Sequence, residues 1–204
     1  MTSEVLDHRG PRYTYRKVPM VLRPFQRPHP PLWYGLGHLE GVEWAATNKV
    51  HVITNQTCEG SKPLFERYRE VWQRKHGEAP LPKLGMSRHV VLAPTEAQAE
   101  ALVRPNYAVW YANLTKLWRD FGSIPIRFAR DFDEARQRGL AIVGTPARVR
   151  EEIERQVAAS GCTYLACRMM FGNMSEAEAS SSIDLFTAEV MKHLTALAEA
   201  GGKP

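Results

Sequence analysis

Residues 32–55 read LWYGLGHLEGVEWAATNKVHVITN, which predicts a strand, a glycine-rich turn, a short helix and a second strand in that order. The run at 32–35 is apolar and aromatic, as strands commonly are. Within 40–48, Val42, Ala45 and Ala46 fall on one side of a helix. The β-branched run at 50–54 predicts the next strand. Strands that alternate with helices in this way indicate an α/β protein with a parallel sheet.

The alternation continues to the end of the chain. Apolar runs predict further strands at 84–92 and 162–171. Four helices are predicted to begin at the capping candidates Ser61 (with Pro63 in the first turn), Thr95 (with Gln98), Thr145 (with Pro146) and Ser175 (with Glu178). We expect Gly77 and Gly161 to end two of them. Pro105 should bend or interrupt the helix that Thr95 opens.

The two ends of the chain and one internal stretch depart from this pattern. Residues 1–31 are rich in proline and arginine, and we expect an extended segment with one short strand at 18–22. Residues 199–204 are expected to be a flexible tail. The charged, glycine-flanked stretch at 122–139 suggests a mobile lid, and an irregular surface segment explains it equally well.

Composition narrows the classes of function. The chain has 204 residues, a net charge of +5 and three cysteines, at 58, 162 and 167. An odd, widely spaced cysteine set excludes a disulfide framework and fits a reducing cytoplasm, and the N-terminus shows no secretory signal. No apolar run approaches the ~18 residues of a membrane span. Basic and acidic residues alternate, which favours a solvated surface over a nucleic-acid site; a nucleic-acid-binding module would rest on the net charge alone.

Most familiar catalytic motifs are absent from the sequence. There is no metal-ligand spacing, nucleophile elbow, P-loop or dinucleotide fingerprint. His89 lies inside an apolar strand and is interpreted as a core histidine with its hydrogen bonds satisfied. Cys162 and Cys167 flank a strand and are interpreted as small core residues.

The turn at 35–41 is the segment best suited to bind a ligand. It joins the carboxyl end of a strand to the start of a helix, where parallel α/β folds bind ligands. Its glycines free backbone amides to approach a phosphate, and His38 could add a donor. Taken alone, the turn is interpreted as an ordinary tight connection.

Several further stretches resemble one family. PHPPLWYG at 28–35, EWAA at 43–46, VGTP at 143–146, CRMMFG at 167–172 and SIDLFTAEVM at 182–191 are similar, in order and spacing, to the bacterial luciferase-like monooxygenases. The resemblance implies a (β/α)8 barrel that uses reduced FMN or the deazaflavin F420. It covers only the second half of that barrel, strands five to eight, which we place at 32–198. The family's catalytic histidine lies in the first half, so no catalytic residue is assigned.

The resemblance also implies cofactor-binding positions. Gly35, Leu36, Gly37, His38 and Gly41 match the loop that holds the flavin phosphate, although glycine and histidine replace the family's serines. At the end of the next strand, Thr54 and Asn55 match positions near the flavin ring. Arg168 and Met170 belong to the last strand, and one of them is expected to face the barrel interior.

The function implied is that of a flavin-dependent oxidoreductase acting on a small organic substrate and oxygen in the cytoplasm. Half a barrel leaves open sheet edges, so we expect self-association or a separate N-terminal half to complete the fold. The alternative is a flavin-binding protein of the same fold without catalysis. Neither a metal nor a nucleic acid nor a membrane is expected to take part.

Overall fold

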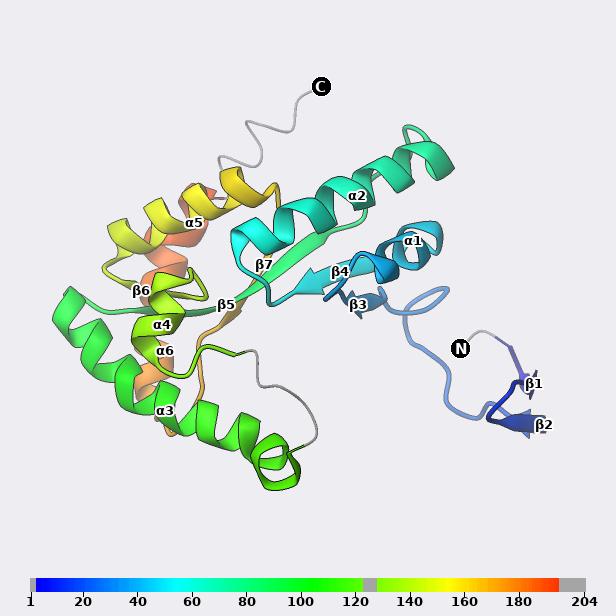
Figure 1. The fold of residues 1–204 in the computed structure, drawn as a ribbon, viewed down its shortest axis with the longest axis horizontal. Helices are drawn as coiled ribbons and strands as arrows, with labels where there is room; N and C mark the ends of the chain where they lie inside the picture. Colours follow the sequence, from blue (N-terminus) through cyan, green and yellow to red (C-terminus); the bar gives the residue numbers. More distant parts are fainter. Residues whose placement is uncertain (1–2, 123–127, 195–204) are drawn as a thin grey trace. The chain divides into compact units, whose positions relative to one another are not determined.

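A computed structural model describes residues 3–122 and 128–194 of the chain. The chain divides into two compact units, Met1–Trp33 and Tyr34–Pro204 (Figure 1). The tail predicted at 199–204 and part of the lid predicted at 122–139 lie outside the described residues. The rest of that lid region, which we expected to be irregular, contains the short helix α4 (Phe132–Gln137).

The first unit contains an antiparallel hairpin of β1 (Val5–Arg9) and β2 (Thr14–Pro19). The amide of Gly10 donates to the Tyr13 carbonyl at 2.8 Å, which closes the turn. The single strand predicted at 18–22 is therefore wrong, because the second strand begins at Thr14 and ends at Pro19. Nearly every residue of the hairpin is exposed, so no apolar alternation marked it in the sequence.

A five-stranded sheet forms the centre of the second unit (Figure 1). Its members are β3 (Trp33–Gly35), β4 (His51–Thr54), β5 (Leu84–Leu92), β6 (Ala141–Gly144) and β7 (Tyr164–Arg168). The strands β4, β6 and β7 all run parallel to β5, which confirms the predicted α/β class with a parallel sheet. The strand β6 was not predicted from the sequence, because its four residues form too short an apolar run to be recognised.

The long strand β5 organises this sheet. Gly85 pairs with Ile53 of β4 and with Tyr164 of β7, while His89 pairs with Ala141 of β6 and with Arg168 of β7. One residue of a strand has only two neighbours, so β4 and β6 share one edge of β5 and β7 occupies the other. Paired residues face the same side of a sheet, so His89 and Arg168 lie on one face.

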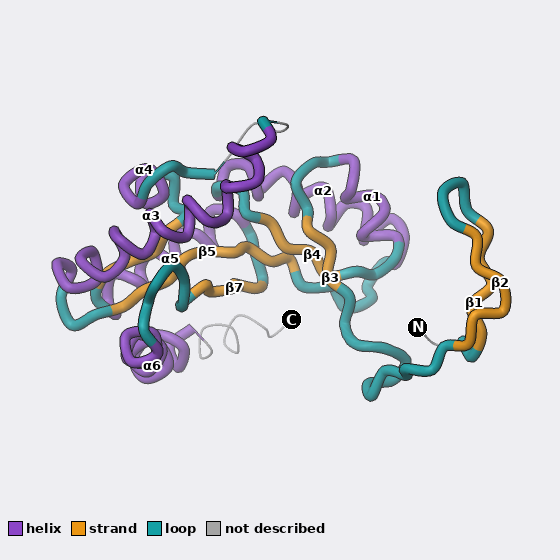
Figure 2. The backbone as a smooth tube through the Cα atoms, turned by 90° about the horizontal axis from the view of Figure 1, so that it is seen from below, coloured by secondary structure: helices purple, strands orange, loops and turns teal. Residues whose placement is uncertain are grey.

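Helices cover the sheet as expected for an α/β unit. They are α1 (Glu40–Thr47), α2 (Cys58–His76), α3 (Glu96–Phe121), α4, α5 (Pro146–Ser160) and α6 (Glu176–Leu185), which continues as the π-helical segment η1 (Phe186–Met191). Figure 2 shows α3 and α6 on opposite sides of β5. Buried side chains gather between these helices and the sheet in three clusters.

Most predicted helix ends are confirmed. Thr95, Thr145 and Ser175 cap their helices through side-chain oxygens, and Gly161 ends α5 with a φ of 70°. Ser61 does not cap α2, because Thr57 does so four residues earlier and the Ser61 hydroxyl donates to the Thr57 carbonyl at 2.7 Å.

Pro105 does not interrupt α3, which continues to Phe121. Buried residues on both sides of the proline, Val103 and Tyr107, hold the two parts of the helix on the same core. This packing compensates for the one helical hydrogen bond that a proline removes.

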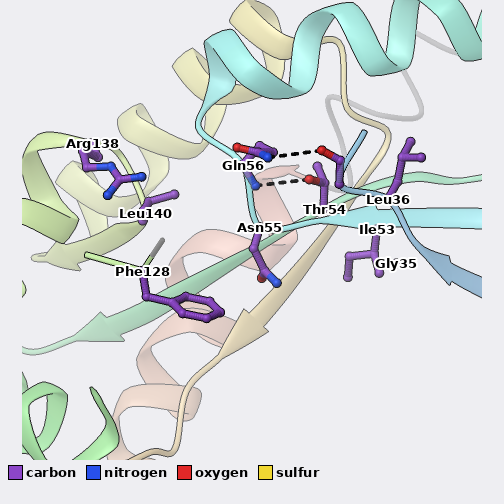
Figure 3. A pocket seen from close by; sticks show the side chains of 10 residues that line it. Gly35, Leu36, Ile53, Thr54, Asn55, Gln56, Phe128, Arg138 and Leu140 are labelled. Atoms are coloured by element: carbon purple, nitrogen blue, oxygen red, sulfur yellow. Dashed lines mark hydrogen bonds between the residues drawn. The ribbon is translucent and has the colours of Figure 1, made fainter. Parts of the chain in front are cut away.

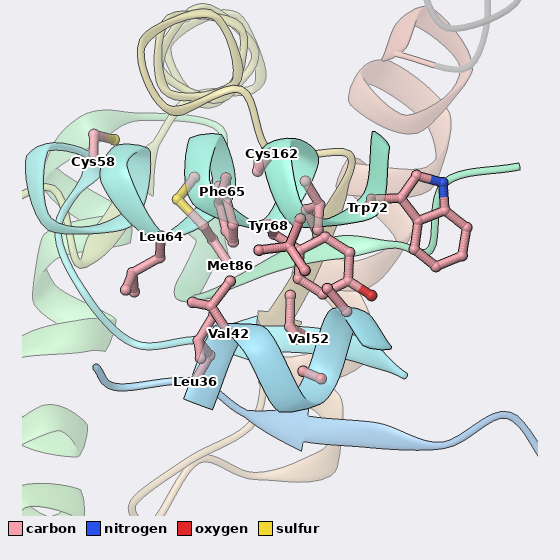
Figure 4. Close-up of a cluster of buried hydrophobic side chains, with 14 residues drawn as sticks. Leu36, Val42, Val52, Cys58, Leu64, Phe65, Tyr68, Trp72, Met86 and Cys162 are labelled. Atoms are coloured by element: carbon pink, nitrogen blue, oxygen red, sulfur yellow. The ribbon is translucent and has the colours of Figure 1, made fainter. Parts of the chain in front are cut away.

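The first cluster fixes the ends of β3 and β4. Figure 4 shows Phe65 and Tyr68 of α2 packed near Val42 of α1 and Val52 of β4. All four side chains are fully buried. Because α1 is held in this way, the turn that leads into it has a fixed position relative to β4.

Candidate functional site

A cavity of about 590 Å³ opens at the carboxyl ends of β3 and β4 (Figure 3). We call it the strand-end cavity. It is lined by Gly35, Leu36, Gly37, Ile53, Thr54, Asn55, Gln56, Phe128, Arg138 and Leu140. Its position is the one at which parallel α/β folds bind ligands, and its volume is that of a small-molecule site.

The backbone of the turn after β3 forms one wall of this cavity. A Cβ placed on Gly35 or Gly37 would meet no atom within 4 Å, so both glycines border open space. The Leu36 side chain is only 3% exposed and belongs to the core, so Leu36 contributes its backbone to the wall. Its amide donates to the Ile53 carbonyl at 2.8 Å, which joins the turn to β4.

Gln56 is a site residue that the sequence analysis missed. Its backbone amide donates to Thr54 Oγ1 at 3.2 Å, and its side-chain Nε2 donates to the Gly37 carbonyl at 3.4 Å (Figure 3). These two bonds link the end of β4 to the turn after β3. The sequence did contain a signal for it, because Gln56 continues the polar run that begins with Thr54 and Asn55.

Three more lining residues come from a stretch that looked irregular in the sequence. Phe128, Arg138 and Leu140 close the cavity on the side opposite the turn. Arg138 is the charged member of the lining, and its Nη1 donates to Glu134 Oε1 at 2.9 Å. No sequence spacing relates these residues to β3, so only the folded chain brings them together.

A second hollow of about 510 Å³, the turn recess, shares Gly35, Leu36 and Gly37 with the strand-end cavity. It adds His38 and Gly41, two of the four predicted residues that do not line the larger cavity. In the described part of the chain, the amides of Gly37, His38 and Leu39 donate to no acceptor. Three such amides before a helix form a concave donor set suited to an anion.

Gly41 has a packing role beside Tyr34, and its predicted phosphate contact stays a prediction. Its amide already donates to the His38 carbonyl at 3.3 Å. A Cβ at this position would lie 2.8 Å from Cε1 of the Tyr34 ring, so glycine lets α1 approach Tyr34 closely. The first turn of α1 also carries Glu40 and Glu43, which disfavour an anion there.

The structure does not place Arg168 or Met170 in the strand-end cavity. Arg168 ends β7 and lies beside the aromatic side chains of α3, with its guanidinium carbon 5.5 Å from the centre of the Trp110 ring. Met170 follows the strand and is 60% exposed. The predicted site residues therefore fall into two groups, one at the turn after β3 and one at the end of β7.

His89 is buried as expected, but its hydrogen bonds are not satisfied. The side chain is 1% exposed, and its Nε2 has no hydrogen-bond partner in the described part of the chain. The rings of Tyr107, Trp110 and Phe171 meet it edge to face, at 4.3 to 5.2 Å between centres. Burial, reinforced by Arg168, lowers the pKa of His89 to about 3, so the ring is neutral near pH 7.

The cysteines belong to the packing. Cys58 and Cys162 are buried in the first cluster, and Cys167 packs against the cluster under α5. Burial raises the pKa of Cys167 to about 11, so its thiol stays protonated near neutral pH. Cys162 and Cys167 are therefore confirmed as small core residues.

Residues 3–122 and 128–194 contain neither a metal-binding cluster nor a membrane-spanning helix. No group of three or more His, Cys, Asp or Glu side chains in this part of the chain is arranged to hold a metal ion. No helix within the same ranges is long and apolar enough to cross a membrane.

Comparison with known proteins gives a family match over most of the chain. The family model described as luciferase-like monooxygenase matches residues 1–164. An uncharacterized protein of Sinorhizobium fredii, y4wF, is 32% identical over 176 residues, which make up 83% of this chain and 50% of that protein.

Solved structures share the fold at lower identity. Monooxygenase RslO1 from Streptomyces bottropensis superposes with a TM-score of 0.75 at 23% identity, over 95% of this chain and 57% of that one. The oxygenating constituent of 3,6-diketocamphane monooxygenase from Pseudomonas putida, in complex with FMN, gives 0.63 at 20% identity, over 80% and 49%. The coenzyme F420-dependent tetrahydromethanopterin reductase from Methanopyrus kandleri gives 0.61 at 13% identity, over 92% and 57%. The chain thus spans about half the length of these relatives.

Proposed function

Because the chain belongs to the luciferase-like monooxygenase family, we propose that it provides the cofactor-binding half of a flavin-dependent oxidoreductase. The observation that carries the proposal is the open backbone of the turn after β3, where Gly35 and Gly37 border space that a ligand could occupy. The polar ends of β3 and β4 converge on the same space. Both FMN and F420 are retained as cofactors, since relatives that share the fold include an FMN complex and an F420-dependent enzyme.

The turn recess fits the cofactor's phosphate. The three unpaired amides of Gly37, His38 and Leu39 would donate to phosphate oxygens, and the His38 ring would add a further donor. Glu40 opposes this charge from the first turn of α1. The backbone thus replaces the serine hydroxyls of the family's usual loop, and the acidic first turn limits the affinity.

The strand-end cavity fits the flavin ring. Thr54, Asn55 and Gln56 offer polar groups along one wall, while Ile53, Phe128 and Leu140 supply apolar surface. A bound reduced flavin would supply reducing equivalents for reaction with oxygen or another acceptor. The chain's own residues orient the ring and exclude water from it, and Gln56 holds the two sides of the site in register.

The remaining part of the active site is proposed to come from outside this chain. The sheet face that carries Ile53 and Tyr164 is only partly covered in the described structure, with Tyr164 39% exposed. A first half of the barrel, on the same polypeptide or on another, or a second copy of the chain, would cover this face and close the sheet. We also propose a division into a proline-rich N-terminal segment at 1–31, which contains the β1–β2 hairpin, a half barrel at 32–198 and a tail at 199–204. The protein is proposed to act in the cytoplasm on an organic substrate.

A second candidate function is flavin binding without catalysis by this chain alone. Among the described residues, those that line the strand-end cavity include no aspartate, glutamate, histidine, cysteine or tyrosine, so they offer no obvious proton-transfer group. This lining favours a site that holds a flavin but leaves the chemistry to residues elsewhere.

Titration of the purified chain with FMN, F420 and riboflavin tests the proposal, with quenching of flavin fluorescence as the readout. Since riboflavin lacks the phosphate, we expect it to bind about tenfold more weakly than FMN, a difference of about 1.4 kcal/mol. Absence of binding by all three compounds would overturn the proposal. If a flavin binds, oxygen consumption with a flavin reductase and NADH separates the enzyme from the non-catalytic alternative. Only the enzyme should raise the rate above that of the same mixture without the chain.

A further inference from the structure

The end of β7 carries a cation, Arg168, that has no counter-ion among the residues that the structure describes. In residues 3–122 and 128–194, no carboxylate lies within salt-bridge distance of Arg168, and its Nε is buried without a hydrogen-bond partner. Burial lowers the pKa of the guanidinium, the interaction with Tyr107 partly offsets this, and repulsion from Arg88 lowers the pKa further. An unpaired, partly buried arginine is costly in a folded protein, which points to a partner that arrives from outside.

Aromatic rings hold this arginine in place. The guanidinium lies over the Trp110 ring at 5.5 Å, an arrangement in which the ring face attracts the cation. His89, the residue paired with Arg168 across the ladder, packs edge to face on the same Trp110 ring at 4.3 Å. The neutral His89 adds a buried polar nitrogen without an acceptor or donor opposite it. Arg168 and His89 therefore place a delocalised cation and a buried polar nitrogen next to the same aromatic ring.

Both Arg168 and His89 are connected to the strand-end cavity through neighbouring residues. The Trp110 ring meets the Phe128 ring at 6.0 Å, and Phe128 lines the cavity. On the other side, the His89 amide donates to the carbonyl of Leu140, a second lining residue, at 3.2 Å. Arg168 thus lies next to residues of the cavity wall without lining the cavity itself, on the face of β5 and β7 that would look into a closed barrel.

We propose that Arg168, supported by Trp110 and His89, binds the anionic oxygen edge of a planar, delocalised ligand. The chemical class is an aromatic carboxylate, a phenolate or an enolate, and the inference rests on the proposed function in that it deepens the same site. A planar guanidinium matches two oxygens of such an anion better than an ammonium does. Aromatic neighbours add contact for a flat ring and would not favour a strongly hydrated phosphate.

Two sources could present this chemistry: an acidic organic substrate or the anionic ring of the reduced flavin. The experiment uses the full chain and calorimetric titration with sodium benzoate, with neutral benzamide as the uncharged match. A parallel arm titrates oxidised FMN and, anaerobically, reduced FMN. The variants are Arg168→Met, which keeps the apolar contact with Trp110, and Arg168→Lys, which keeps the charge alone. The control is Arg148→Met, which removes an exposed arginine from α5.

We expect benzoate to bind the wild-type chain and benzamide to bind at least tenfold more weakly. Arg168→Met should lose at least tenfold in benzoate affinity, Arg168→Lys should recover part of it, and Arg148→Met should match the wild type. If the loss in Arg168→Met falls on benzoate while both FMN affinities stay unchanged, the ligand is an acidic substrate. If it falls on reduced FMN alone, the ligand is the reduced cofactor, and the proposal stands in that form.

Equal affinities of wild type and Arg168→Met for benzoate and for reduced FMN would overturn the inference, as would failure of the wild type to bind either one. Benzoate binding that depends on Arg168 in a chain that binds no flavin would support the inference and refute the proposed function. Circular dichroism of each variant verifies that the variant is folded, so that a lower affinity is not caused by unfolding.

Discussion

The turn after β3 and the end of β7 both follow the carboxyl end of a strand, yet they offer a ligand different chemistry. At the turn, the donors are the backbone amides of Gly37, His38 and Leu39, and no charged side chain is buried. At the end of β7, the polar groups are the side chains of Arg168 and His89, buried among aromatic rings. Access to the amides after β3 depends on the glycines of the turn, whereas the position of Arg168 and His89 depends on packing against aromatic rings.

This difference determines how each region should respond to change. A site made of backbone tolerates side-chain substitution unless a Cβ enters the ligand's space. Buried, unpaired polar side chains carry a large desolvation cost, so the second site should be sensitive to pH and to charge removal.

Acid should destabilise the fold because it favours protonation of His89, the partner of Arg168 in the β5–β7 ladder. The pKa of His89 falls from 6.5 to about 3 on folding, with burial as the main cause. Between these values the unfolded chain binds a proton that the folded chain does not, so the free energy of unfolding decreases as pH falls through this window. About 5 kcal/mol of unfolding free energy should be lost across the whole window.

Urea denaturation of the wild type and of His89→Phe at several pH values between 7 and 3.5 measures this loss. Phenylalanine fits the same aromatic surround but does not titrate, so its stability curve should be flatter than that of the wild type. Parallel curves for the two proteins would contradict the assignment to His89, because all other titrating groups are common to both.

Two glycine-to-alanine substitutions compare the regions directly. Gly172, after β7, has a φ of 64°, and a Cβ there would lie 2.2 Å from the Asn106 carbonyl oxygen. Gly172→Ala should therefore cost about 3 kcal/mol of stability from backbone strain and overlap. Gly37→Ala should change stability by less than about 0.5 kcal/mol and instead weaken FMN binding. Equal stability losses in the two variants would contradict this contrast.

Much of the first region could be predicted from its sequence. The glycines at 35 and 37, the helix at 40–47 and the strand before Thr54 are local patterns, and the structure has them within a residue or two. The role of Gly41 could not be predicted, since it depends on how closely the Tyr34 ring approaches α1. The spacing of residues in the sequence thus predicts the turn, but it does not predict how side chains pack around the turn.

The second region shows why the remainder was missed. Arg168 was identified by its place in a strand, but its Trp110 contact joins residues 58 positions apart in the sequence. The helix that carries Trp110 was expected to bend or be interrupted at Pro105, five residues before it. The cavity wall at Phe128, Arg138 and Leu140 likewise arises from tertiary contacts across a stretch without regular hydrophobic spacing.

Removing each of two arginines should have opposite effects on stability. Arg88 is 0% exposed, but its Nε donates to Gln156 Oε1 at 2.7 Å and its Nη1 donates to the Ser87 carbonyl at 2.9 Å. Arg88→Met leaves those acceptors unsatisfied and should cost about 2 kcal/mol. Arg168→Met removes a charge without a counter-ion and should stabilise the chain by about 1 kcal/mol.

Thermal melting of the two arginine variants tests this sign difference, with a lower Tm for Arg88→Met and a higher Tm for Arg168→Met than for the wild type. A large loss of stability in Arg168→Met would mean that the arginine is already paired in the folded chain. In that case the β7 site would be structural, and the contrast with the turn after β3 would fail.

The smallest expected effect concerns the charge beside the turn recess. Glu40 lies in the first turn of α1, directly after the free amides of Gly37, His38 and Leu39. Glu40→Gln removes the negative charge and should strengthen FMN binding by about 0.5 kcal/mol, or about twofold, at low salt. Riboflavin, which has no phosphate, should bind both proteins equally, and the gain for FMN should shrink as salt is added. A gain of the same size for riboflavin would place the effect on the ring or the fold instead of the phosphate, and the recess would then not be the phosphate site.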